Sequence, residues 1–215
     1  MPENLFETQY DLTKKSKLQR FYDSYKIVIF SFIFILVILY GSFGYYLKSK
    51  ENKKILLSEN YLQAKIYLEG GDENKAINLL KEVIFANDPT YSSLSLFLLM
   101  NQNLITDYKE TSDLFDHLLK NNKFSKEVRN LLVYKKALLN SNFMDESKLL
   151  ESVRPLLDTK TLWHPHGLIL LGDYFVSKGE YIKAREFYQK IFAIKNLEKD
   201  FYYHASSQLA LIVNE

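Results

Sequence analysis

The chain has 215 residues, 47% of them hydrophobic, which is enough for one domain of ordinary size in addition to its termini. Its formal net charge is +2, from 28 basic and 26 acidic residues. Because the basic and acidic residues are nearly equal in number, the composition does not predict nucleic-acid binding. Because the sequence contains no cysteine, disulfides, thiolate nucleophiles and thiolate-bound zinc are excluded. Only 7 Gly and 4 Pro interrupt it, which favours long helices over a many-stranded sheet.

An uncharged run of 21 residues lies between Lys26 and Lys48. A helix of this length, rising about 1.5 Å per residue, matches a hydrocarbon core of roughly 30 Å. Fourteen of the residues are Ile, Leu, Val or Phe, each of which favours insertion by roughly 0.3–0.6 kcal/mol near the membrane centre. We expect residues 27–47 to form a single transmembrane helix. The alternative is a cleaved signal peptide, since the end of the run contains small residues at Gly41, Ser42 and Gly44.

Charge alone does not orient this segment, because five Lys or Arg residues precede it and four Lys residues follow it closely. A segment so near the N-terminus often acts as a signal anchor, and a long following domain crosses largely regardless of its charge. We therefore expect residues 1–26 to form a basic, amphipathic cytoplasmic tail, which either lies along the inner membrane surface or simply extends the membrane helix. Its apolar stripe is Leu18, Phe21, Tyr22 and Tyr25. The remaining residues, 48–215, are expected on the other side of the membrane.

Two helical hairpins are predicted in this remaining part, 108 residues apart and in register. The first turns at "EGGDE" (69–73) and the second at "SKGEY" (177–181), and each turn lies between two apolar stripes of helical period. Gly71 and Gly179 differ by 108 positions, as do Ala76 and Ala184, and this separation equals three periods of 36. The spacing therefore indicates a repeated hairpin.

The hairpins resemble the tetratricopeptide repeat, which combines a Leu-Gly pair with an aromatic residue and a later small residue at fixed offsets. In such a pattern small residues let paired helices approach, while bulky residues fill the space around them. The residues expected to form these packing seams are Ala64, Tyr67, Gly71, Ala76, Leu80, Leu171, Gly172, Phe175, Gly179, Ala184 and Tyr188.

The glycine signature is missing between the two hairpins, although the apolar pattern continues. Residues 91–120 and 125–157 are expected to form helix pairs, and residues 199–213 a terminal helix that closes the stack. The predicted fold is all-α: one transmembrane helix followed by a tetratricopeptide-like α-solenoid of about four helix pairs plus a terminal helix.

The whole chain also resembles a known family. The resemblance is based on four parts of the sequence: the tail "LFETQYDLTKKSKLQRFYDSYK" (5–26), the single apolar segment, Trp163 with the histidines after it, and "GLILLGDYFVSKGEYIKAREFYQKI" (167–191). Together they look like the ancillary SecYEG translocon subunit family, the YfgM-like proteins. The resemblance implies a single-pass inner-membrane protein with a periplasmic repeat domain. It also implies association with the SecYEG translocon and periplasmic chaperones, and no catalysis. The alternative is a cell-envelope assembly adaptor that does not contact the translocon.

The candidate binding residues are polar or aromatic residues on the first helix of each hairpin that do not belong to its apolar packing stripe. They are Asn60, Gln63, Tyr174 and Lys178. The first helices of stacked pairs line the concave side of a solenoid, where a partner would bind. A solvated helix face has the same composition, so this alternative stays open.

Catalytic, cofactor and metal sites are not predicted. His164 and His166 flank Pro165, but zinc needs three or four ligands and no third candidate lies nearby in the sequence. We expect Pro165 to open a helix instead. The carboxylates of Glu127, Asp145, Glu146 and Glu151 have no spacing that selects a catalytic pair, and no phosphate-binding loop or nucleophile motif is present.

Overall fold

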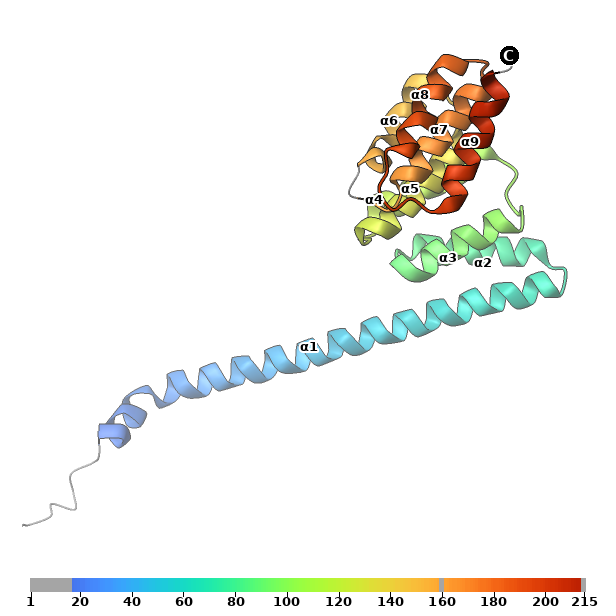
Figure 1. Cartoon of the computed structure of the whole chain (residues 1–215). Helices are drawn as coiled ribbons and strands as arrows, with labels where there is room; N and C mark the ends of the chain where they lie inside the picture. The colour runs from blue at the N-terminus through green and yellow to red at the C-terminus, as the bar shows by residue number, and fades with distance from the viewer. Residues whose placement is uncertain (1–16, 159–160, 214–215) are drawn as a thin grey trace, which may run out of the picture. The chain divides into compact units, whose positions relative to one another are not determined.

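The structure, a computed structural model, describes residues 17–158 and 161–213 (Figure 1). All regular secondary structure within these residues is helical, which confirms the all-α prediction. The elements are α1 (Lys17–Glu69), α2 (Glu73–Phe85), α3 (Pro89–Asn101), α4 (Tyr108–Asn121), α5 (Lys126–Asn140), α6 (Glu146–Val153), the 3-10 helix η1 (Arg154–Leu157), α7 (His164–Ser177), α8 (Tyr181–Phe192) and α9 (Lys199–Val213). The chain divides into two compact units, residues 1–55 and 56–215.

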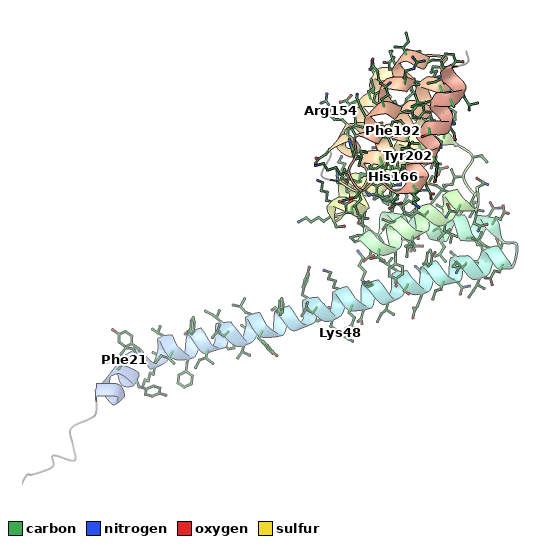
Figure 2. All side chains as sticks on the ribbon, in the orientation of Figure 1. Phe21, Lys48, Arg154, His166, Phe192 and Tyr202 are labelled. Carbon is green, nitrogen blue, oxygen red and sulfur yellow. The ribbon has the colours of Figure 1, made fainter. Side chains whose placement is uncertain are left out.

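The first unit consists, in its described residues, of the N-terminal part of α1. Its apolar side chains between Ile27 and Leu47 are exposed around the helix, apart from Ile29, which is partly buried (Figure 2). In the described part of the chain, α1 is the one helix long and apolar enough to cross a membrane. It continues without a break through the expected borders after residues 26 and 47. Residues 1–16 of the expected tail lie outside the described residues.

The second unit contains two apolar clusters. The first core joins the last turns of α1 to α2, α3, α4 and α5 through Ala64, Ala76, Leu80, Ile84, Leu96, Leu99, Leu114, Phe115, Leu118 and Leu132. The second core joins α5 to the elements that follow through Ala137, Leu149, Val153, Leu156, Leu168, Leu170, Leu171, Tyr174, Phe175, Ala184, Tyr188, Ile191, Ala205 and Ile212. Helix α5 contributes to both cores, because Leu132 lies in one and Ala137 in the other. Helices α7, α8 and α9 pack side by side around the second core (Figure 1).

The two turns that the sequence places 108 residues apart have the same geometry. At the end of α1, Gly71 has φ +79°, and the backbone N–H of Asp72 donates to the Tyr67 carbonyl at 2.8 Å. At the end of α7, Gly179 has φ +70°, and the Glu180 N–H donates to the Phe175 carbonyl at 2.9 Å. These are Schellman caps, in which a left-handed residue allows the last carbonyls of a helix to be satisfied.

A third helix, α3, ends in the same type of Schellman cap, but with asparagine in place of glycine. Asn103, after α3, has φ +51°, and the Leu104 N–H donates to the Leu99 carbonyl at 2.9 Å. Asparagine is among the few residues with a side chain that adopt the left-handed region readily. The missing glycine signature between the hairpins is thus explained here by an asparagine in the same role.

Helix α7 approaches α8 closely at Gly172. A Cβ built on Gly172 would lie 2.8 Å from both Cδ1 and Cζ of Tyr188 and closer still to Cε1 of the same ring. Tyr188 is completely buried, and Ala184, one turn earlier on α8, is also completely buried. The ring therefore occupies space that only the missing side chain of Gly172 leaves open.

Candidate interaction site

Two of the four candidate binding residues lie together at the C-terminal end of α7. The Lys178 ammonium lies 5.3 Å from the centroid of the Tyr174 ring, within the range of a cation–π contact. The Tyr174 side chain belongs to the second core, and only 7% of the residue is exposed. Lys178, in contrast, is exposed. A partner at this position would meet the lysine and little of the tyrosine ring.

The other two candidates lie on the last turns of α1. Gln63 is exposed and Asn60 is partly buried. Next to Asn60, the ring of Tyr61 lies 6.3 Å from that of Tyr91 on α3. Within residues 17–158 and 161–213, no hydrogen bond, ion pair or ring contact joins these two candidates to those on α7. The four residues therefore lie on two helices, as two pairs that do not contact each other in the described part of the chain.

A groove that the sequence analysis did not single out lies between α3 and the start of α5. It has a volume of about 310 Å³. Its lining residues are Pro89, Thr90, Ser93, Leu94, Phe97, Lys123, Phe124, Ser125 and Val128. Leu94 is 40% exposed and Val128 is 39% exposed, so apolar surface faces the solvent on both sides of the groove. The signal in the sequence is the i, i+3 spacing of Leu94 and Phe97, but the side chains opposite come from more than 25 residues further along the chain.

A polar cluster joins α7, α8 and α9. The hydroxyl of Tyr188 donates to Oδ1 of Asp173 at 2.6 Å, and Nε2 of His204 lies 2.8 Å from the same oxygen. Burial and the neighbouring Asp173 carboxylate raise the pKa of Tyr188 well above its usual range. Tyr188 therefore stays protonated and acts as a donor. No regular spacing in the sequence predicts this cluster, because its members come from three helices.

His166, which is labelled in Figure 2, lies in an aromatic cluster rather than in a set of ligands. Its ring centroid is 4.7 Å from those of Trp163 and Phe201 and 5.4 Å from that of Tyr134. Burial lowers the pKa of His166, and a hydrogen bond to the Leu162 backbone counteracts this only in part. Helix α7 begins at His164 with Pro165 in its first turn, as expected. In the described residues, no three His, Cys, Asp or Glu side chains are grouped so that they could hold a metal ion.

Three of the four carboxylates considered in the sequence, those of Glu127, Asp145 and Glu146, have structural contacts. Asp145 caps α6 by accepting from the Lys148 backbone N–H at 2.9 Å, and this bond lowers the pKa of Asp145. Glu146 binds the Lys183 ammonium at 2.8 Å, which connects α6 to α8. The Thr161 hydroxyl lies 3.4 Å from the Glu127 carboxylate. Each of these three carboxylates thus contacts groups of the scaffold.

Comparisons of the chain with protein-family models, with curated proteins and with solved structures give no match. The fold and the surface features therefore define its class: an all-helical protein with one helix long and apolar enough to cross a membrane.

Proposed function

We propose that the protein is a single-pass, non-enzymatic scaffold of the bacterial inner membrane, associated with the SecYEG translocon. In this proposal residues 27–47 span the membrane with the N-terminus in the cytoplasm. Residues 48–215 then form a tetratricopeptide-like domain in the periplasm that binds chaperones or emerging substrates. The observation that carries the proposal is the exposed apolar helix that runs without a break into a repeated helical hairpin.

The membrane anchor is supported by the exposure of its side chains. A core helix of a water-soluble protein would bury an apolar face, whereas no residue in the apolar window of α1 is buried. Apolar surface of this length is stable in hydrocarbon, where the helix satisfies all its own backbone hydrogen bonds.

The repeat-domain proposal is supported by the two matching caps, at Gly71 and Gly179. In a solenoid the first helices of the pairs face the concave side. By chain order these would be α3, α5 and α7 together with the end of α1. The α3–α5 groove would then lie on that side, where its apolar walls suit the apolar side chains of an extended polypeptide segment and Lys123 suits an acidic neighbour.

Orientation is tested with a reporter fused after Glu215 that is active only outside the cytoplasm. Activity of the fusion in intact cells is the expected result. A reporter that functions only in the cytoplasm would reverse the proposed topology.

Partner identity is tested by crosslinking from the juxtamembrane residues 20–55. Because the chain lacks cysteine, a single Cys introduced at Tyr45 or Asn52 provides a unique attachment point for a photoreactive group. We expect capture of a SecYEG subunit. Capture of other envelope proteins without any translocon subunit would favour the alternative, a general envelope adaptor.

A further inference from the structure

Four lysines follow the apolar part of α1 within seven residues: Lys48, Lys50, Lys53 and Lys54. All four residues are exposed (Lys48 is labelled in Figure 2). One acidic residue, Glu51, lies among them, and its carboxylate is 3.5 Å from the Lys48 ammonium. The segment 48–54 therefore carries three positive charges in excess.

Helix geometry places three of these lysines on one face. At 3.6 residues per turn, Lys50, Lys53 and Lys54 fall within a sector of about 100°. With a rise of about 1.5 Å per residue, they lie roughly 5–11 Å beyond Leu47 along the helix axis. A bilayer's headgroup region extends roughly 5–8 Å beyond each side of the hydrocarbon core. Since lysine stems are long and bend toward the interface, their ammonium groups reach the depth of the lipid phosphates.

We propose that Lys50, Lys53 and Lys54 form a binding face for the phosphate groups of anionic phospholipids, which they gather around the end of α1. This inference rests on the proposed membrane anchor, because the apolar segment is what holds the lysines at this depth. Lipid phosphates are held at the depth of these ammonium groups, whereas phosphate dissolved in water is not, so the lysines are expected to bind lipid. Each lysine near an anionic membrane surface raises the binding constant for that surface by up to roughly fivefold. The attraction falls off over about 10 Å at 0.1 M salt.

The opposite end of the apolar segment provides a comparison. The seven residues before Ile27 contain Arg20, Asp23 and Lys26, an excess of one positive charge. The preference for anionic lipid is therefore expected mainly at the lysine-rich end.

The test uses the full chain with Asn52→Cys, labelled with a fluorophore and reconstituted into vesicles of phosphatidylcholine and phosphatidylglycerol. A small fraction of either lipid carries a nitroxide quencher at the same shallow position on its acyl chain. We expect phosphatidylglycerol to quench at least about twofold more than phosphatidylcholine at low salt, and the ratio to approach one at 1 M salt. In K50Q/K53Q/K54Q the ratio should be close to one even at low salt.

The control K65Q/K109Q/K120Q removes the same charge at exposed positions away from this segment and should keep the twofold ratio. Two results would overturn the lysine assignment. One is equal quenching by the two lipids in the labelled Asn52→Cys chain that keeps all its lysines. The other is a quenching ratio that K50Q/K53Q/K54Q leaves unchanged. Alkaline extraction of the same vesicles reports the anchor separately. A chain that is released by alkali contradicts the membrane span itself, whereas a chain that resists extraction but shows no lipid preference contradicts only the present inference.

Discussion

Tyr188 and Gly172 lie in contact where α7 meets α8, with Cδ1 of the buried ring 2.8 Å from the position that a Cβ on Gly172 would take. Because Tyr188 is completely buried and its hydroxyl is held by Asp173 at 2.6 Å, the ring cannot move aside freely. This contact sets the separation of the two helices.

Gly172→Ala is expected to destabilise the protein by about 1–3 kcal/mol, the usual cost of forcing extra volume into a packed core. The free energy of unfolding would be measured by denaturant titration of the full chain in detergent. Gly70→Ala is the matched control, because a Cβ there would meet only backbone oxygens at ordinary contact distances. Equal stability of the two variants would contradict the packing described for α7 and α8.

Gly179→Asn is expected to destabilise less than Gly179→Ala. The left-handed conformation costs an alanine roughly 1–2 kcal/mol, whereas asparagine tolerates it better. The chain itself has asparagine in this conformation at Asn87, Asn103 and Asn196. Thermal unfolding of the two variants side by side provides the measurement. If alanine were tolerated as well as asparagine, the cap after α7 would not depend on its left-handed residue.

Tyr188→Phe removes a hydroxyl that donates to a carboxylate and should cost about 1 kcal/mol, because Asp173 is partly solvated. A double-mutant cycle with Asp173→Ala, which removes the acceptor, should give a coupling energy of at least about 0.5 kcal/mol. An additive double variant would mean that the 2.6 Å contact contributes nothing to stability.

His166 should make stability depend on pH in mildly acidic solution. Burial lowers its pKa in the folded protein, so the unfolded chain binds more protons below the usual histidine value of about 6.5. The stability that the neutral, buried His166 contributes is therefore fully present above the usual histidine pKa of about 6.5. This stability is lost as the pH falls from there toward the lowered pKa of the folded protein. His166→Phe keeps an aromatic ring against Trp163 and should flatten the dependence between pH 7 and 5, as measured by unfolding at each pH. The same slope with and without His166 would show that another group is responsible.

The membrane anchor should fail only when enough of its insertion energy is removed. Fourteen apolar residues supply roughly 4–8 kcal/mol, and one arginine near the centre costs roughly 2.5–3.5 kcal/mol. We expect Val37→Arg alone to remain in the membrane pellet and Ile33→Arg/Val37→Arg to appear in the soluble fraction. Leu62→Arg/Ile66→Arg, at exposed positions of the second unit, should not alter fractionation. A double arginine variant that still resists alkaline extraction would contradict the span.

Local pattern predicts most of the helical content but not the contacts between distant segments. The turns at Gly71 and Gly179 follow from glycine and helical period alone, because both signals are local. Asn103 was not predicted as a cap, since asparagine is common in ordinary loops as well. The cluster of Asp173, Tyr188 and His204 depends on how three helices pack, and the α3–α5 groove depends on tertiary structure in the same way. Tyr174 has the polar hydroxyl of a binding residue, yet its ring lies in the second core, because burial is decided by packing and not by residue type.

The shared space of Gly172 and Tyr188 has an evolutionary consequence. A mutation that enlarges residue 172 is tolerated only after, or together with, a mutation that makes the side chain at residue 188 smaller. The two positions should therefore change as a pair across homologous proteins. A homologue with alanine at the first position is expected to have a smaller side chain, such as leucine, at the second.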